Sequence, residues 1–479
     1  MKPVFGYLSQ PEIERIHQSA LEILRDVGMQ MPSEEAVKLM KEAGCEVAGE
    51  NIVKIPAPLV QYAIEKAPGR DQVTLYGRKP EYDINFEADA PFIACMTEAT
   101  QVIDPHTLKK RPATNEDLAR LTRVVNQLDQ VRINSALVTP QDVPKEISDW
   151  YTWATSLKNT AKHITGAALG AEGVRDTARM AAAAVGGEEA FRQRPFISFW
   201  VLSRPPLQVD RLTIEALIEM SRWKIPAIIS SGPIVGITSP VTLSGTVAQA
   251  HAEVLALLTV TQVASPGAPV VYTSFARSMD MRTGGVSMSS PEFGILKAAM
   301  AQMGRFLGLP VRMPAMLRDA KILDAQAGFE TALTGLVCAM AADIMDAMQF
   351  DSDIVVDFAD LVFCNECMGA LKRMARDMIV DDDSLALGII REIGPGGNFL
   401  RHKHTFNNFR REVWQPKIFE RRVWASWEKD GSKDIHRVAM EKVLKLMEAE
   451  TPEHMVSTEA AGEIDAIVRQ ASLDYSKSI

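Results

Sequence analysis

Five aromatic side chains stand at or just beyond the ends of short apolar runs: Trp200, Tyr272, Phe275, Phe358 and Phe363. Rings that converge on one point bind a quaternary ammonium ion by cation–π attraction, which contributes up to about 2 kcal/mol in a site without water. The apolar runs predict buried strands, so these rings are expected to gather where the strands end. Ordinary core packing is the competing interpretation for each ring taken singly.

Backbone amides near Ser231 and Gly232 offer a second chemical feature. Both residues lie in the segment Ser-Ser-Gly-Pro, shortly before a long predicted helix. N–H groups at such a turn can bind an anion such as a carboxylate. The pattern matches neither a nucleoside triphosphate loop nor a dinucleotide fingerprint, and a plain strand-to-helix connection explains it equally well.

Metal binding and covalent catalysis find little support in the sequence. Cys364 and Cys367 are spaced as C-x-x-C, but there is no second cysteine pair and no histidine at ligand spacing around them, so free structural thiols and no metal site are predicted. Lys162 and Lys321 are the candidates for a Schiff-base lysine, which would make the protein a lyase of the same fold. No side chain can be assigned a catalytic role from the sequence.

The elements that must position these residues form a repeating pattern from about residue 91 onward. Short apolar runs alternate with longer amphipathic segments, which is typical of βα units with a parallel sheet. The segment 324–348 is read as one helix. Eight runs are predicted as strands: PFIAC from residue 91, RINSALV from 132, KHITGAAL from 162, PFISFWV from 195, PAIISS from 226, PVVYTSF from 269, PVRMPAM from 310 and DIVVDF from 353.

This count predicts an α/β fold of the TIM (β/α)8 barrel type, with a doubly wound sheet as the alternative. In such a barrel the active site is built by the loops that leave the carboxyl ends of the strands. The loop that follows PVVYTSF is the longest, and it ends at Ser289-Ser290-Pro291-Glu292, a predicted helix start with proline in the first turn.

The barrel is expected to span residues 91–393, with additions at both ends. Residues 1–90 predict a helical cap followed by a β-hairpin around Gly-Arg-Lys-Pro. Residues 394–479 predict a helical extension that packs on the barrel or on a neighbouring subunit. Its aromatic and arginine-rich stretch from Phe406 to Trp427 favours a homo-oligomer.

Composition restricts the partners and the compartment. With 52 Lys and Arg against 61 Asp and Glu, the chain carries a formal charge of −9, so neither nucleic acid nor an anionic membrane is an expected partner. The N-terminus does not read as a signal peptide, and the five cysteines fit a reducing compartment. The cytoplasm is therefore the expected location.

Four long segments together resemble the trimethylamine methyltransferase family, and in particular its members that lack pyrrolysine. They are LKKRPATNEDLARLTRVVNQLDQV (108–131), SGPIVGITSPVTLSGTVAQAHAEVLA (231–256), LRDAKILDAQAGFETALTGL (317–336) and GGNFLRHKHTFNNFRREVWQPKIFERR (396–422). The resemblance implies a TIM barrel whose mouth receives a separate corrinoid protein. It also implies that cobalt(I) of that partner takes a methyl group from an amine, with no cofactor bound permanently to this chain.

The resemblance further implies a substrate other than trimethylamine, because the trimethylamine enzymes use pyrrolysine and this chain contains only ordinary residues. Glycine betaine, which would leave as dimethylglycine, is the first expectation. Arg312 is then the expected partner of the substrate carboxylate, with a structural ion pair as the alternative. Glu98 and Asp319 are expected counter-charges for the ammonium group, and helix capping competes for Asp319. A non-catalytic protein that binds quaternary amines is the remaining alternative.

Overall fold

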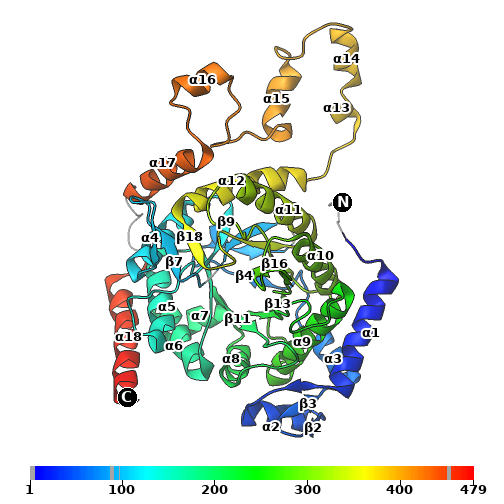
Figure 1. The fold of residues 1–479 in the computed structure, drawn as a ribbon, viewed down its shortest axis with the longest axis vertical. Helices are drawn as coiled ribbons and strands as arrows, with labels where there is room; N and C mark the ends of the chain where they lie inside the picture. Colours follow the sequence, from blue (N-terminus) through cyan, green and yellow to red (C-terminus); the bar gives the residue numbers. More distant parts are fainter. Residues whose placement is uncertain (1–5, 87–90, 97, 450–454, 479) are drawn as a thin grey trace.

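Eight parallel strands form a ring at the centre of the molecule (Figure 1). The computed structural model describes residues 6–86, 91–96, 98–449 and 455–478. The hydrogen-bonded strand order is β13-β12-β11-β10-β9-β6-β17-β16, and a bridge between Tyr272 and Val311 joins the two ends of this sheet. The strands are β6 (Phe92–Cys95), β9 (Val131–Ser135), β10 (His163–Gly166), β11 (Ile197–Leu202), β12 (Ala227–Ser230), β13 (Val270–Tyr272), β16 (Arg312–Pro314) and β17 (Ile344–Ala347). The predicted TIM barrel is confirmed.

All predicted strands except the last belong to this barrel. The run DIVVDF forms β18 (Val355–Asp357), which pairs with β7 (Gln101–Ile103) and β8 (Lys110–Pro112) in a separate three-stranded sheet. The eighth barrel strand is instead β17, which lies inside the segment predicted as one helix. The prediction failed because Asp343 and Asp346 interrupt the apolar run of β17, and because the preceding helix ends at Ala341 without a glycine or proline to mark its end.

The helices that surround the barrel present their apolar sides to the strands (Figure 1). Side-chain caps fix several of their starts: Ser290 accepts a hydrogen bond from the Phe293 N–H group, and Asp324 accepts one from the Ala327 N–H group. The surrounding helices are α4 (Asn115–Gln127), α5 (Ser148–Asn159), α6 (Gly170–Ala183), α7 (Glu188–Gln193), α8 (Arg211–Arg222), α9 (Leu243–Ala264), α10 (Pro291–Phe306), α11 (Ala325–Ala341) and α12 (Phe358–Met374). Short 3-10 turns lie at Pro80–Tyr82 and Lys145–Ile147.

The N-terminal segment covers one side of the barrel with α1 (Gln10–Asp26), α2 (Glu34–Glu42) and α3 (Ala57–Lys66), all of which pack on α9. A small antiparallel sheet of β1 (Met29–Gln30), β2 (Glu46–Ala48) and β3 (Ile52–Lys54) joins these helices. Within the described residues, α9 is the one helix long and apolar enough to cross a membrane, and 78% of its most apolar window is buried inside the protein.

The predicted hairpin closes the amino end of the barrel. Its strands, β4 (Thr74–Leu75) and β5 (Ile84–Asn85), pair in antiparallel fashion. Leu75 and Phe86 pack with Ile133, Ile228 and Val271 from the barrel interior. Because this end is filled by apolar side chains, the carboxyl end of the barrel is the end left for a site.

The C-terminal residues return to the barrel after a projecting excursion. Residues 376–434, here called the arm, contain α13 (Asp382–Leu385), α14 (Leu387–Ile393), α15 (Lys403–Glu412) and α16 (Trp424–Lys429), and they extend beyond α12 away from the barrel (Figure 1). The chain then packs α17 (Ile435–Glu448) on α12 and α18 (Thr458–Ser478) on α6 and α5. The long loop after β13 carries a short hairpin of β14 (Ser278–Met279) and β15 (Val286–Ser287).

Candidate active site

A cavity of about 600 Å³ opens at the carboxyl end of the barrel. The chain segments that follow β6, β10, β11, β13 and β17 supply its walls, as a TIM-barrel site requires. Its apolar lining includes Met96, Ala167, Leu169, Trp200, Leu202 and Phe275, and its charged lining consists of Glu98, Arg204, Asp210, Arg277 and Asp353.

Trp200 and Phe275 form an aromatic wall in this cavity. Their ring centroids lie 5.6 Å apart with an interplanar angle of 69°, which is an edge-to-face pair. The Trp200 indole N–H group is buried, and within the described part of the chain it has no hydrogen-bond partner. Gly232 packs behind this wall, since a Cβ atom at that position would lie only 3.2 Å from the Cβ atom of Phe275. The two rings predicted to meet here therefore do meet.

Arg312 lies beneath the wall and has no exposed surface. Its guanidinium carbon is 4.4 Å from the centre of the Trp200 ring, and its nitrogens bind Asp346 at 2.6 and 2.9 Å. The remaining donors reach the hydroxyl groups of Thr165 and Ser135, each at 3.1 Å. Its prediction as the carboxylate partner of a ligand is wrong, because a fully buried guanidinium with this set of internal partners supports Trp200 from below.

Glu98 and Asp353 are the two carboxylates of the cavity interior. Both sit in left-handed backbone, with φ values of 72° and 73°. For a residue other than glycine this conformation costs about 1–2 kcal/mol, and such strain tends to gather at functional sites. The Asp353 Oδ1 atom is buried and, among the described residues, accepts no hydrogen bond. The placement of Glu98 in the site agrees with the prediction from the sequence, whereas Asp353 was not foreseen.

Burial controls the protonation of these carboxylates. Glu98 is open to the cavity but surrounded by protein, and this burial, with the nearby Asp149 carboxylate, raises its pKa to about 7. Burial likewise raises the pKa of Asp353 to about 7, although the Arg277 guanidinium opposes the rise. Both groups therefore exchange their proton near neutral pH.

Arg277 supplies the cation of the cavity interior. Burial lowers the pKa of its guanidinium, and its Nε atom is buried without a hydrogen-bond partner among the described residues. The loop that carries Phe275 and Arg277 is held from below by Lys297, whose Nζ atom donates to the carbonyl oxygens of Ser274 and Ala276 at 2.7 and 2.6 Å. A held guanidinium with a spare donor is suited to a ligand carboxylate.

Asp319 organises the loops of the cavity from outside it. Its carboxylate accepts hydrogen bonds from the hydroxyl groups of Ser287, Ser289 and Ser352 and from the Met288 N–H group. These bonds tie the loop after β13 to the residue that precedes Asp353. The prediction that Asp319 faces a ligand cation is therefore wrong: its carboxylate is occupied in joining two loops.

The Ser231 side chain stabilises the loops around the cavity. Its hydroxyl group donates to Glu253 on α9 at 2.8 Å, and Glu253 also accepts hydrogen bonds from the Ser203 hydroxyl group and the Leu207 N–H group. Glu253 thus joins the loops after β11 and β12. An anion held by the backbone at Ser231 and Gly232 stays a prediction.

The remaining predicted aromatic residues lie outside the cavity. Tyr272 points away from the barrel interior, and its hydroxyl group bonds the Nδ1 atom of His251 on α9 at 2.9 Å. Phe358 is fully buried at the start of α12, and Phe363 contacts Phe419 with ring centroids 6.0 Å apart. Phe358 and Phe363 were misplaced because the strand assigned before them belongs to the separate sheet.

Arg277, Asp353 and Met96 are among the cavity residues that the sequence did not single out. Arg277 had a usable signal, because it stands two residues after Phe275, which was already predicted for the site, and the two-residue period of extended chain puts both on one face. Asp353 had none, because its position was read as the first residue of a strand. Among the described residues, no cluster of three or more His, Cys, Asp or Glu side chains suits a metal ion.

The whole chain is similar to methyltransferases that act on methylated amines. The model of the trimethylamine methyltransferase (MTTB) family matches residues 1–471. A trimethylamine methyltransferase of Desulfitobacterium hafniense (strain DSM 10664 / DCB-2) is 33% identical over 470 residues, which cover 98% of this chain and 94% of that protein. A glycine betaine methyltransferase of Desulfitobacterium hafniense (strain Y51) is 28% identical over 442 residues, or 89% of each chain.

The solved structure of the monomethylamine methyltransferase of Methanosarcina barkeri is similar in fold. The superposition gives a TM-score of 0.52 at 13% identity and covers 91% of this chain and 93% of that one. At this identity the likeness supports the barrel fold alone.

Proposed function

Because the chain belongs to the trimethylamine methyltransferase family and is a methyltransferase, we propose that it removes a methyl group from a small quaternary amine at the barrel mouth and passes it to cobalt(I) of a separate corrinoid protein. Glycine betaine is the proposed substrate and dimethylglycine the product. The observation that carries this proposal is one cavity that combines an aromatic wall, two carboxylates and a guanidinium.

Each part of glycine betaine has a partner of suitable chemistry in this cavity. The trimethylammonium group suits the ring faces of Trp200 and Phe275, with Glu98 and Asp353 as counter-charges. The carboxylate of the substrate suits Arg277, whose guanidinium can form two parallel hydrogen bonds with it. A ligand without a carboxylate would leave the buried Nε–H group of Arg277 without an acceptor among the described residues, which disfavours simple methylamines.

The transfer itself needs little acid or base chemistry from the protein. The methyl carbon–nitrogen bond breaks, its electron pair stays on nitrogen as the neutral amine of dimethylglycine, and the methyl carbon accepts the electron pair of cobalt(I), which becomes methylcobalt(III). Since a quaternary nitrogen is already a cation, the side chains act by binding, orienting and excluding water.

The rim of the cavity suits a protein partner. Side chains of several mouth loops expose large apolar groups: Leu169 (46% exposed), Leu202 (44%), Ile237 (55%), Val241 (66%), Met281 (72%) and Ile354 (46%). Apolar groups gathered around a polar cavity are typical of a surface that another protein covers. This supports docking of the corrinoid protein over the mouth.

The activity should depend on pH in a way set by the two carboxylates. Quaternary ammonium ions keep their charge at every pH, whereas Glu98 and Asp353 lose theirs below a pKa of about 7. We therefore expect kcat/KM for glycine betaine to rise from pH 6 to pH 8 and then level off; each of the two carboxylates lowers the value at pH 6 about tenfold, so the wild type should lie roughly a hundredfold below its plateau. Steady-state rates across this range check the expectation, and the Glu98→Gln and Asp353→Asn variants should each have a flatter profile.

Arg277 should control which ammonium compounds are accepted. Replacing it with glutamine removes a charge-assisted bond to the substrate carboxylate, and such a bond contributes about 1.5–3 kcal/mol. We expect kcat/KM for glycine betaine to fall by roughly 10–150-fold, by the factor of ten that corresponds to each 1.4 kcal/mol. The matched substrate is tetramethylammonium, which has no carboxylate and should be affected little. An equal loss with both substrates would contradict the assignment of Arg277.

A substrate panel tests the proposed function as a whole. The protein is mixed with a free cobalt(I) corrinoid and with glycine betaine, tetramethylammonium, choline or trimethylamine in turn, and the absorption spectrum of methylcobalt(III) is followed. The proposal expects the fastest appearance with glycine betaine. No methylcobalt(III) with any quaternary amine would overturn it, and tight binding without turnover would favour a binding protein.

A Schiff-base lyase is the weaker alternative. Lys162 lies at the closed amino end of the barrel, where its Nζ atom donates to the carbonyl oxygens of Val125 and Leu128 at 2.7 Å each. Lys321 is exposed and forms an ion pair with Asp351. Neither residue lines the cavity at the barrel mouth, so borohydride with carbonyl substrates is expected to trap no adduct there.

A further inference from the structure

The turn that carries Asp353, residues 350–354 between β17 and β18, has an unusual backbone. Its residues Asp351, Ser352 and Asp353 have φ angles of 54°, 54° and 73°. Among the described residues other than glycine, no other two neighbours share this left-handed conformation. A Cβ atom makes such backbone costly at each position, and left-handed residues normally occur singly. The turn is therefore strained, and the contacts around it must hold it.

The loop after β16 holds the turn through its backbone. The Ser352 N–H group donates to the Arg318 carbonyl oxygen, and the Asp351 N–H group donates to the Ala320 carbonyl oxygen, each at 3.0 Å. The buried Arg318 guanidinium also lies over the Phe350 ring, with its carbon atom 4.2 Å from the ring centre. Arg318 thus contacts the turn with both its backbone and its side chain.

The Ser352 side chain ties the turn to two neighbouring loops. Its hydroxyl oxygen lies 2.9 Å from Asp319 Oδ1 and 3.1 Å from the carbonyl oxygen of Val286 in the hairpin after β13. A hydroxyl group carries one hydrogen, so these two acceptors share it. The Asp319 carboxylate is in turn held by the hydroxyl groups of Ser287 and Ser289. Ser352 is therefore the one residue of the turn whose side chain reaches this network.

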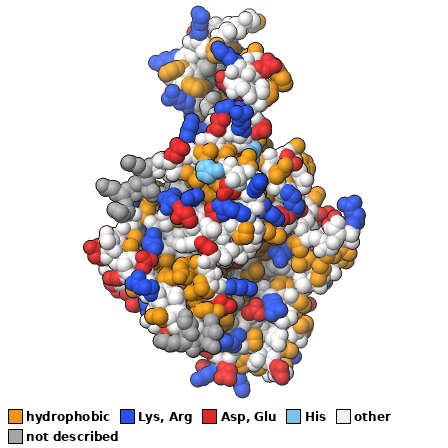
Figure 2. All heavy atoms as spheres, turned by 60° about the vertical axis from the view of Figure 1, so that its left-hand side comes forward, with side chains coloured by type: hydrophobic (Ala, Val, Ile, Leu, Met, Phe, Trp, Pro, Cys, Tyr) orange, Lys and Arg blue, Asp and Glu red, His pale blue; other side chains and the backbone are white. Residues whose placement is uncertain are grey.

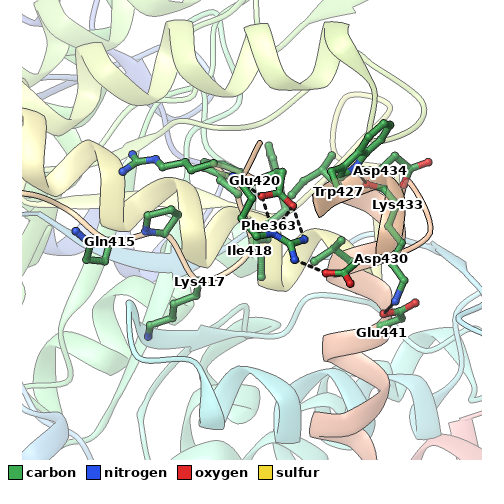
Figure 3. Close-up of a pocket in the computed structure, with 16 residues that line it drawn as sticks. Phe363, Gln415, Lys417, Ile418, Glu420, Trp427, Asp430, Lys433, Asp434 and Glu441 are labelled. Atoms are coloured by element: carbon green, nitrogen blue, oxygen red, sulfur yellow. Dashed lines mark hydrogen bonds and ion pairs between the residues drawn. The ribbon is translucent and has the colours of Figure 1, made fainter. Parts of the chain in front are cut away.

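Helix α12 is the base on which the turn is held. The Arg318 guanidinium bonds the Asp360 carboxylate in the first turn of α12, and both side chains are fully buried. Phe363, three residues further along, lines a separate cavity of about 850 Å³ between residues 415–422 and the start of α17 (Figure 3). This second cavity lies at the base of the arm, which Figure 2 shows as a lobe beyond the barrel. Its wall contains no residue of the turn, so a substitution there provides a control.

The turn places the Asp353 carboxylate in the cavity at the barrel mouth. The charged groups that face it are Arg277 after β13, Lys297 on α10, Asp346 on β17 and Asp319 after β16. Burial outweighs the two cations and raises the pKa of Asp353 to about 7. A carboxylate that left the cavity for water would regain its ordinary pKa. The pKa of Asp353 therefore reports whether the turn is closed.

We propose that residues 350–354 form a strained turn that holds the Asp353 carboxylate in the cavity, and that Ser352 is the positioning residue that keeps the turn closed. Without the hydroxyl group of Ser352, the turn relaxes toward right-handed backbone and Asp353 leaves the cavity. The effect on catalysis rests on the proposed function, whereas the position of Asp353 is a property of the free protein.

The Ser352→Ala and Ser352→Gly variants separate the hydroxyl bonds from the strain. Both lack the hydroxyl group, but glycine adopts left-handed backbone without a steric cost and alanine does not. We expect Ser352→Ala to withdraw Asp353, so that Glu98 alone controls the pH dependence. Its kcat/KM for glycine betaine at pH 6 should then lie about tenfold below its own plateau, instead of roughly a hundredfold. Ser352→Gly should keep a profile closer to that of the wild type.

Thermal unfolding across pH tests the turn without any substrate. From about pH 4 to pH 7 the folded protein keeps the Asp353 proton while the unfolded chain has released it, so stability falls as the pH rises through this range. Asp353→Asn should remove this part of the fall in melting temperature, and Ser352→Ala should remove as much. A protein that does not methylate glycine betaine would overturn the proposed function, and these melting temperatures would still decide the role of Ser352.

Lys433→Met is the control, because it breaks the ion pair with Glu441 in the wall of the second cavity (Figure 3). It should keep the pH dependence of the wild type in both measurements. A Ser352→Ala protein that melts with the wild-type pH dependence overturns the proposal. A Ser352→Gly protein no closer to the wild type than Ser352→Ala also overturns it, because strain would then play no part.

Discussion

Replacing Trp200 with leucine should lower kcat/KM for glycine betaine by on the order of 30-fold. Leucine keeps the side chain apolar but removes the ring, and cation–π attraction in a site without water contributes up to about 2 kcal/mol, with tenfold in rate for each 1.36 kcal/mol. The edge-to-face contact with Phe275 is lost at the same time. Steady-state methyl transfer at low substrate concentration measures this loss.

Trp200→Phe is the matched control, because it keeps an aromatic face at the same position and should retain most of the activity. The loss in Trp200→Leu should appear mainly in KM if the ring binds substrate and transition state equally. Wild-type kinetics in Trp200→Leu, or an equal loss in Trp200→Phe, would show that the ring does not contact the ammonium group.

Replacing Arg312 with methionine should have the largest effect on stability. The substitution leaves the Asp346 carboxylate buried without its partner, and breaking a buried ion pair in this way costs about 3–5 kcal/mol. The double variant Arg312→Met/Asp346→Leu removes both charges and should regain much of this free energy of unfolding. Urea unfolding followed by tryptophan fluorescence compares the three proteins, and a double variant no more stable than Arg312→Met would contradict the account.

The Arg312 variants also test whether the side chain that stabilises the fold is the one that positions Trp200 for substrate binding. Its guanidinium lies against the Trp200 ring, so the double variant should regain stability but still bind glycine betaine less tightly than the wild type. Full recovery of both properties would mean that Trp200 keeps its position without this contact.

Hydrophobic periodicity predicted most of the barrel, because strands covered on both faces read as continuous apolar runs. It failed at β17, where Asp346 faces inward to meet Arg312 and breaks the run. The same inward ion pair explains why Arg312 was misassigned. From the sequence alone, an arginine that binds a ligand at the barrel mouth cannot be distinguished from one whose donors are all bound to side chains inside the barrel.

The aromatic residues show a second limit of the sequence. Tyr272 and Phe275 stand three positions apart, and the period of two sends them to opposite sides of the strand path. Because both faces of these strands are apolar, the sequence does not reveal which side is inward. The left-handed backbone of Glu98 and Asp353 is likewise invisible in the sequence, since neither residue is a glycine.

The central claim is that the mouth cavity moves a methyl group from glycine betaine to cobalt, and isotopic labelling tests it most directly. Glycine betaine with ¹³C in its N-methyl groups is incubated with the protein and a cobalt(I) corrinoid, and both products are quantified by mass spectrometry. The account predicts labelled methylcobalt(III) and dimethylglycine in equal amounts, with both reduced together in the Trp200→Leu variant. Dimethylglycine without labelled methylcobalt(III), or no label transfer at all, would contradict it.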